Sequence, residues 1–143
     1  MSSAEWNADM PSFGKRSMDR IATLDPRWPP ILTAAILETD FTVICGHRGA
    51  SAQTEAYEKG LSKTPWPRSK HNKLPSLAVD LAPWYTEEPH IRWKRNSDFI
   101  DLSAVILGKA LELETNVRWG GDWDQDGDMT DQTFMDIGHY ELM

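Results

Sequence analysis

The stretch SKHNKLPSLAVD, from Ser69 to Asp80, places His71 and Asp80 nine positions apart around an apolar run. The end of this stretch and the three residues after it, SLAVDLAP (76–83), are typical of a short strand that ends at its proline. Two interpretations of the polar pair are open. His71 and Asp80 are either a surface histidine and a turn aspartate, or two ligands of one metal ion that a turn through KLPS brings together.

The segments on either side of this stretch indicate the fold class. FTVICG (41–46) is rich in residues that favour strands and predicts a buried strand. Helices are expected at about 17–24, 31–38, 51–60 (capped by Ser51) and 98–114, a basic surface loop at 61–75, and a last short strand after a Gly- and Asp-rich loop. The pattern predicts an α+β fold, in which helices cover a small antiparallel sheet.

Length, composition and charge limit the function classes. A chain of 143 residues with 40% hydrophobic content fits one domain, here expected to span residues 1–143. The net charge of −7 argues against binding to nucleic acid or to anionic lipid. The N-terminus lacks an apolar export signal, and no window of 18 apolar residues occurs, so we expect no membrane insertion. We also expect a monomer.

Cysteine and tryptophan usage favours a packed core. The single cysteine, Cys45, lies within FTVICG and is interpreted as a small buried hydrophobe, which leaves no intramolecular disulfide. Seven tryptophans are many for this length. Large rings either fill a core or line a groove, and for each tryptophan alone the core is the expectation.

The C-terminal segment DIGHYELM adds a third candidate ligand, His139, and changes the interpretation of the first pair. Catalytic zinc takes three protein ligands of nitrogen or oxygen type and keeps one position open for water. Asp136 lies three residues before His139, so its carboxylate can stand beside a metal-bound imidazole without being a ligand. A base in that place can take a proton from water and later deliver it to a leaving amine.

Four segments together resemble one known family. SKHNKLPSLAVDLAP resembles the Ser-x-His and Ala-x-Asp motif of the zinc-dependent D-Ala-D-Ala carboxypeptidases and L-alanyl-D-glutamate endopeptidases, and DIGHYEL resembles their closing Asp-x-x-His segment. GHRGASAQTEAYEKGLSK is similar to the Gly-x-Arg segment and the helix after it, and RWGGDWD to the Gly-Gly-x-Trp stretch. The resemblance runs from about Phe13 to Leu142, and small phage endolysins are most similar.

The resemblance implies a hedgehog/DD-peptidase-like fold with the zinc site at the sheet, and a role for each matching residue. His71, Asp80 and His139 would hold Zn²⁺, and Asp136 would be the general base and then the general acid. Arg48 would stabilise the oxyanion that develops on the scissile carbonyl. The spacing between His71 and Asp80 is two residues longer than in the shorter form of the motif, so the loop between them is expected to be expanded.

Two further residues are expected to support the ligands. The resemblance gives Ser69 a place beside the metal site, where its hydroxyl would form a hydrogen bond. Glu141 lies two residues after His139 and projects from the same face of a strand. It would either orient a ligand by a hydrogen bond or pair with Arg48; it is not expected to be a ligand.

An acidic segment, DWDQDGDMTDQT, suggests a second metal ion. The acidic side chains concerned are Asp122, Asp124, Asp126 and Asp128. The first three, with Gly127, match the start of a calcium-binding EF-hand loop, but Thr133 stands where that loop has a glutamate. Calcium binding and a solvated acidic loop are both open interpretations.

The function implied by the resemblance is that of a phage endolysin, which hydrolyses the L-alanyl-D-glutamate bond in peptidoglycan stem peptides and lyses the bacterial host. D-Ala-D-Ala carboxypeptidase activity with the same zinc site is the alternative within the family. A non-catalytic, metal-containing wall-binding module is the alternative outside it. The missing export signal fits a protein that waits in the host cytoplasm until it is released to the wall.

Overall fold

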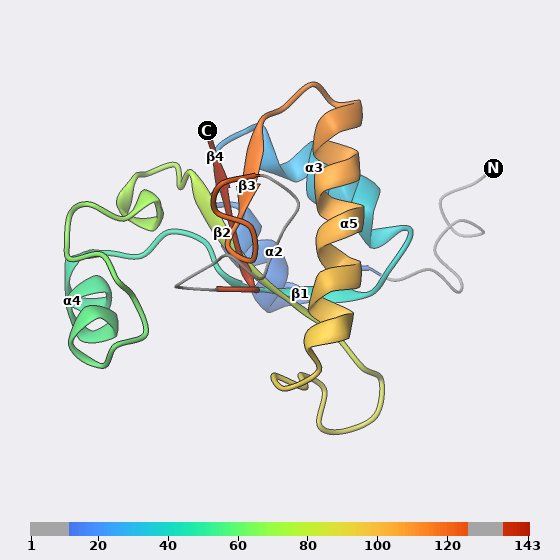
Figure 1. Cartoon of the computed structure of the whole chain (residues 1–143), viewed down its shortest axis with the longest axis horizontal. Coiled ribbons are helices and arrows are strands. Elements are labelled where there is room, and N and C mark those ends of the chain that lie inside the picture. Colours follow the sequence, from blue (N-terminus) through green and yellow to red (C-terminus); the bar gives the residue numbers. More distant parts are fainter. Residues whose placement is uncertain (1–11, 126–135) are drawn as a thin grey trace.

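The computed structural model describes residues 12–125 and 136–143, which form helices around one small sheet (Figure 1). The helices are α2 (Lys15–Ile21), α3 (Trp28–Ile36), α4 (Ala50–Glu58), the short 3-10 helix η1 (Lys70–Asn72) and α5 (Asn96–Glu112). The strands are β1 (Phe41–Cys45), β2 (Ala78–Pro83), β3 (Val117–Trp119) and β4 (His139–Leu142). The α+β class is confirmed.

The sheet is antiparallel throughout and has the strand order β1-β2-β4-β3. Strand β2, which the sequence predicts, therefore lies inside the sheet between β1 and the C-terminal strand β4. Its register places Asp80 opposite His139 on one side and opposite Cys45 on the other. Residues from three distant parts of the chain thus meet at one point of the sheet.

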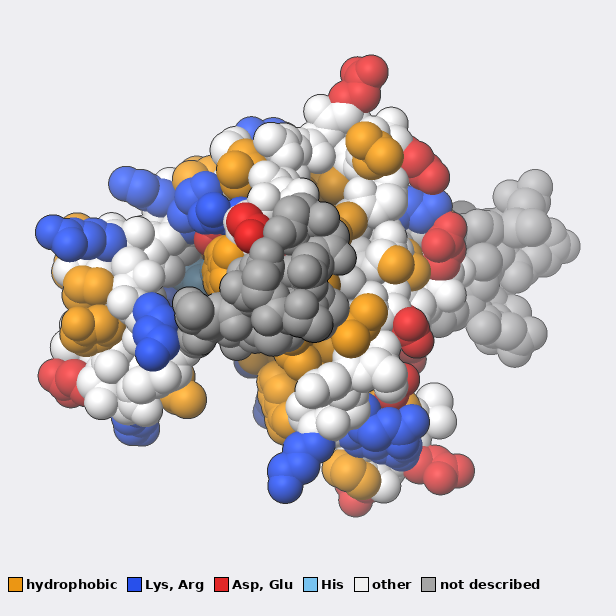
Figure 2. All heavy atoms as spheres, in the orientation of Figure 1, with side chains coloured by type: hydrophobic (Ala, Val, Ile, Leu, Met, Phe, Trp, Pro, Cys, Tyr) orange, Lys and Arg blue, Asp and Glu red, His pale blue; other side chains and the backbone are white. Residues whose placement is uncertain are grey.

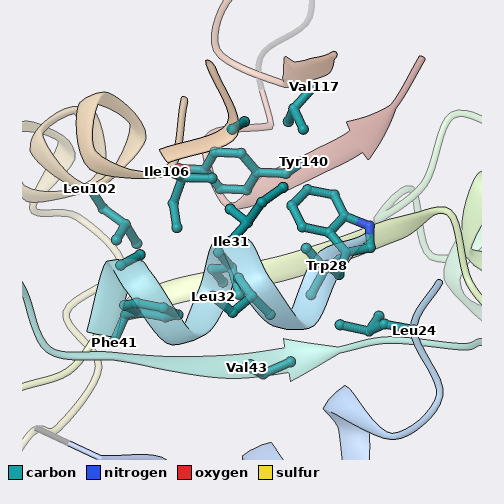
Figure 3. Close-up of a cluster of buried hydrophobic side chains, with 14 of the residues drawn as sticks. Leu24, Trp28, Ile31, Leu32, Phe41, Val43, Leu102, Ile106, Val117 and Tyr140 are labelled. Carbon is teal, nitrogen blue, oxygen red and sulfur yellow. The ribbon is translucent and has the colours of Figure 1, made fainter. Parts of the chain in front are cut away.

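The core lies between the sheet and the helices α3 and α5 (Figure 3). Helix α5 buries Leu102, Ile106 and Ala110, which are spaced four residues apart and therefore share one helical face. They meet Ile31 of α3 and Tyr140 of β4, both of which have no exposed surface. Burial of such side chains contributes about 1.5–3 kcal/mol each relative to full exposure.

Helix α2 protects the outer edge of β1. Ser17 accepts a hydrogen bond from the main-chain N–H of Val43 (3.0 Å), and the Arg20 guanidinium donates to the Val43 carbonyl (2.8 Å). An edge strand with free main-chain groups can pair with another chain. Both groups of Val43 that face away from β2 are satisfied within this chain.

Besides shifts of two or three residues at the ends of α2 and α5, the structure differs from the expectations at three places. Helix α3 begins at Trp28 rather than Ile31, because Pro29 and Pro30 stand in its first turn, where no N–H is needed. Helix α4 begins at Ala50 with Gly49 as its N-cap, so Ser51 is not the cap. The range 61–75 is not all surface loop, since it contains η1, whose His71 is buried.

The expectation that each tryptophan belongs to the core is wrong for three of them. Trp28 and Trp119 are buried, whereas Trp66, Trp84 and Trp93 have 42%, 37% and 58% of their surface exposed. Within the described ranges, no helix is long and apolar enough to cross a membrane.

Gly120 marks a close approach between two chain segments. Its carbonyl accepts from the Asp136 N–H (2.9 Å), and its N–H donates to the His139 carbonyl (2.8 Å). A Cβ at this position would overlap the main-chain carbonyl of Asp136. Only a residue without a side chain allows this contact.

We therefore expect Gly120→Ala to lower the free energy of unfolding by about 1–3 kcal/mol, because the Asp136 backbone must move. Gly108 is the control: it lies exposed in the middle of α5 with open space around it, so Gly108→Ala should raise stability by about 0.5–1 kcal/mol. Urea unfolding monitored by circular dichroism measures both. Equal midpoints for Gly120→Ala and the parent chain would contradict the close approach.

Candidate metal centre

Three side chains from separate elements converge on one point. His71 comes from η1, Asp80 from β2 and His139 from β4. The Asp80 Oδ1 atom lies 3.1 Å from His71 Nε2 and 3.1 Å from His139 Nδ1, and the two nitrogens are 3.3 Å apart. Ligands held about 2.0–2.1 Å from a tetrahedral metal ion are about 3.3 Å from one another. The triangle of donor atoms therefore has the size that such an ion requires.

The outer nitrogen of each imidazole has a partner that can only accept. His71 Nδ1 lies 2.7 Å from the Gly46 carbonyl oxygen, and His139 Nε2 lies 2.9 Å from Glu141 Oε1. Each outer nitrogen therefore carries the proton, and in the neutral ring the inner nitrogen has a lone pair. Two lone pairs and the Asp80 carboxylate then face each other, an arrangement that a bound cation stabilises.

Without a cation, protons occupy this site. Burial alone lowers the pKa of His71, but hydrogen bonds with Asp80 and Cys45 outweigh it and raise that pKa to about 10. Burial likewise opposes the pKa shift of His139, which hydrogen bonds to Asp80 and Glu141 nevertheless raise. The pKa of Asp80 is held well below its usual range, because these two histidines overcome the effect of burial. A metal ion must displace the protons to bind.

Asp136 stands at the edge of the same centre. A carboxylate oxygen of Asp136, one of Asp80 and a nitrogen of His139 all lie within 4.8 Å of one another. The main-chain carbonyl of Asp136 accepts from the N–H of His139 (3.0 Å), which fixes the separation of the two residues. Burial, and next the charge of Asp80, raise the pKa of Asp136. This carboxyl is thus suited to hold a proton nearer to neutral pH than a free aspartate.

Arg48 reaches the centre from the segment after β1. Its guanidinium donates to Asp80 Oδ2 (3.4 Å) and to Gln53 Oε1 (3.2 Å), and its main-chain N–H donates to the His71 carbonyl (2.8 Å). Gln53 also accepts from Asn72 Nδ2 (3.1 Å), which donates to the Arg48 carbonyl as well (3.0 Å). Gln53 and Asn72, which are both buried and were not identified from the sequence, hold Arg48 in place.

Ser69 and Glu141 contact the ligands in different ways. The Ser69 hydroxyl accepts from the main-chain N–H of His71 (3.2 Å) and caps η1. Glu141 bonds His139, and its other oxygen pairs with Arg118 (2.7 Å) and Lys70 (3.3 Å). Burial raises the pKa of Glu141, but the hydrogen bonds from His139 and Arg118 bring it down to about 2. The alternative pairing of Glu141 with Arg48 is not observed.

Cys45 is closer to this chemistry than its apolar neighbours suggest. It is partly exposed, and its sulfur forms a second group with His71 and Asp80, in which one donor atom of each lies within 4.8 Å of the others. Burial raises the pKa of the thiol, but the hydrogen bond and charge of His71 lower it further, to below its ordinary value. The interpretation as a fully buried hydrophobe is wrong, because β1 ends at the metal centre.

The acidic segment is only partly described. Asp126 and Asp128 lie outside the described residues, while Asp122 and Asp124 are described. Neither of these two belongs to the clusters within 12–125 and 136–143 that could hold a metal ion. Calcium binding by this segment stays a prediction.

The centre lines a cleft with a volume of about 350 Å³. The side chains of His71, Asp80, Asp136 and His139 line this cleft. Figure 2 shows Lys and Arg side chains on the part of the molecule that carries α4, with histidine surface visible in the hollow beside it. A peptide bond entering the cleft can therefore reach both the donor triangle and Asp136.

Comparisons with known proteins agree with this geometry. Residues 10–143 match the model of a family described as phage L-alanyl-D-glutamate peptidase. The chain is 29% identical over 136 residues to an L-alanyl-D-glutamate peptidase of Escherichia phage T5, covering 92% of this chain and 97% of that relative. The crystal structure of Serratia marcescens L-Ala D-Glu endopeptidase ChiX has a similar fold, with a TM-score of 0.75, 24% identity, and 96% and 93% of the two chains covered.

Removal of single donors tests the triangle. We expect His71→Ala and His139→Ala to abolish stoichiometric metal content after dialysis, because two donors remain where three are needed. Cys45→Ser should keep one ion per chain, since its sulfur lies outside the triangle of 3.1–3.3 Å contacts. Mass spectrometric metal analysis measures the content. Loss of metal in Cys45→Ser with retention in His139→Ala would contradict this assignment.

The raised pKa values predict a pH dependence of metal stabilisation. For the metal-free chain, the stability contributed by His71 is complete below its unfolded pKa of about 6.5 and is lost as pH rises toward its folded pKa of about 10. The metal binds the unprotonated nitrogens, so its stabilisation grows with pH over this range. The difference in Tm between metal-loaded and chelated protein should therefore widen from about pH 6 to pH 9. A constant difference would argue that the metal does not replace these protons.

Proposed function

Because the chain belongs to the phage L-alanyl-D-glutamate peptidase family, we propose that it hydrolyses the L-alanyl-D-glutamate bond of peptidoglycan stem peptides as a zinc-dependent endolysin. The triangle of Asp80 Oδ1, His71 Nε2 and His139 Nδ1 supports this most directly. Residues 1–143 would form one catalytic domain that acts as a monomer.

The donor set fits zinc better than a hard cation. Two imidazole nitrogens and one carboxylate match the three protein ligands of catalytic zinc sites, whereas magnesium and calcium prefer oxygen donors. Zinc would make a water molecule a better nucleophile at neutral pH and would polarise the scissile carbonyl. The hydrogen bonds to Gly46 and Glu141 would hold both imidazoles in the tautomer that this requires.

Asp136 and Arg48 would provide the proton transfer and the oxyanion stabilisation that the reaction also needs. Asp136 would take a proton from the attacking water and deliver it to the amine of the leaving D-glutamyl group. Its raised pKa supports both halves of this task, since burial and the charge of Asp80 let the carboxyl take up a proton more readily than a free aspartate does. The Arg48 guanidinium, held by Gln53 and Asp80, would face the oxyanion that develops on the alanyl carbonyl.

The biological setting follows from the family. An endolysin of this kind would stay in the host cytoplasm and reach the wall only after another protein opens the membrane. Peptidoglycan would be its macromolecular partner, with no requirement for nucleic acid or for insertion into the bilayer.

The decisive measurement is the identity of the bond that is cut. Zinc-loaded and chelated protein should be incubated with purified peptidoglycan, and the released ends identified by mass spectrometry. We expect new amino termini at D-glutamate with zinc only. Release of free D-alanine would instead indicate a D-Ala-D-Ala carboxypeptidase, and no product from several wall types would indicate a wall-binding module.

Asp136→Asn separates catalysis from metal binding. The amide keeps the shape of the side chain but cannot accept a proton, so we expect kcat to fall by about 10²- to 10⁴-fold with one zinc per chain retained. Asp101→Asn is the matched control, an equal change of charge at an exposed position of α5 outside the metal clusters of the described residues, and should keep activity. Full activity in Asp136→Asn would remove this residue from the mechanism.

A further inference from the structure

Two hollows of opposite character meet at the metal centre. Both are lined by Asp80 and Asp136. The first, the basic hollow, is also lined by Arg48, Lys63, Arg68, Lys70 and Arg118. The second, the apolar hollow, has a volume of about 250 Å³ and is also lined by Ile44, Leu81, Trp93, Phe99 and Ile137. Among the residues that the structure describes, the apolar hollow is lined by no cation, and its charged groups are the two shared carboxylates.

The charge of the basic hollow contrasts with that of the whole chain. The chain carries 15 Lys and Arg against 22 Asp and Glu. Five of those cations nevertheless line one cleft, against three carboxylates among its described residues, those of Asp80, Asp136 and Glu141. Such a local excess attracts an anionic group to this side of Asp136 and leaves the other side unfavourable for it.

The two halves of the proposed substrate also differ in charge. In an L-alanyl-D-glutamate bond, the glutamate supplies its amine to the scissile amide. It has two carboxyl groups, and the peptide continues through at most one of them, so a free carboxylate remains close to the leaving nitrogen. The alanyl half has no carboxylate: its α-carbon, next to the scissile carbonyl, carries a methyl group and the alanine nitrogen.

We infer that the substrate lies across the centre in one direction, with the D-glutamyl half in the basic hollow and the alanyl half in the apolar hollow. This inference rests on the proposed function and adds the binding sites for its two halves. The reverse direction would place a carboxylate among apolar side chains beside Asp80 and Asp136, where burial and like charges both oppose it.

Arg68 is the cation assigned to the free carboxylate. The other arginines of the basic hollow already have anionic partners: Arg48 pairs with Asp80 (3.4 Å) and Arg118 with Glu141 (2.7 Å). Lys70 is held by Glu141 (3.3 Å) and by the Leu142 carbonyl (2.6 Å). The Arg68 side chain is exposed at the cleft and forms no ion pair with any residue in 12–125 or 136–143. Its planar guanidinium suits a carboxylate.

A pair of short peptides tests this assignment. One contains L-Ala-D-Glu with the free carboxylate, and the other carries a carboxamide at that carbon. The zinc-loaded parent chain, Arg68→Gln and the matched control Arg16→Gln are compared by kcat/KM on both. Arg16 is also an exposed arginine, but it lies on α2, away from the basic hollow.

We expect Arg68→Gln to lower kcat/KM for the acid about tenfold, mainly through KM, because a charge-assisted hydrogen bond is lost. The same variant should leave cleavage of the amide unchanged, and Arg16→Gln should match the parent on both peptides. An equal loss on both peptides, or no loss on either, would overturn the role of Arg68 while leaving the peptidase intact. Cleavage of neither peptide by the parent chain would overturn the proposed function and this inference with it.

Substitution of Trp93 tests the position of the alanyl half of the substrate. Trp93 is 58% exposed and stacks on Phe99 with ring centroids 6.0 Å apart, so its removal should leave the core in place. If the apolar hollow holds the alanyl half, Trp93→Ala should lower kcat/KM by the same factor for the acid and the amide. A loss confined to the acid would place the carboxylate in this hollow and overturn the direction proposed.

Discussion

The pairing of β2 with β4 is the constraint on which the metal centre depends. In this register Asp80 faces His139, so a carboxylate and an imidazole from distant parts of the chain meet within 3.1 Å. A shift by one residue would turn Asp80 to the other face of the sheet and separate the two. The buried Val79 and Tyr140 on the neighbouring pair resist this shift, since it would expose them. Packing of the core therefore sets the geometry of the site.

The third donor depends on hydrogen bonds rather than on strand pairing. His71 lies on η1, a single short turn that could not hold an imidazole in place by itself. Its ring is fixed by the Gly46 carbonyl and its main chain by Ser69 and Arg48. Because these partners are buried or partly buried, each lost bond would leave an unsatisfied polar group. The site thus combines a rigid sheet with a polar network that a local pattern does not reveal.

The sequence predicted the parts of this structure that local chemistry determines. Runs of β-formers located β1 and β2, helical spacing located α5, and the polar motifs brought together His71, Asp80, His139 and Asp136. Prediction from the sequence failed where the environment of a residue depends on contacts with residues far away in the chain. Cys45 was interpreted from its apolar neighbours, although β1 ends beside His71, and Gln53 carries no local signal for the buried bonds that hold Arg48. Trp93 is likewise exposed because it lines the apolar hollow, and the hydrophobic periodicity of the sequence gives no sign of that hollow.

Charge has to be considered at two length scales in this protein. A chain of net charge −7 is repelled by an anionic wall polymer at long range, but at physiological ionic strength this repulsion fades within about 8 Å. Recognition of a carboxylate must then come from cations that the substrate touches. Three cations of the cleft, Arg48, Arg118 and Lys70, already pair with Asp80 and Glu141, the carboxylates that hydrogen-bond the two histidines of the candidate metal centre. The same clustering that stabilises the ligand carboxylates therefore creates a local positive surface, and Arg68, outside those pairs, extends it to the substrate.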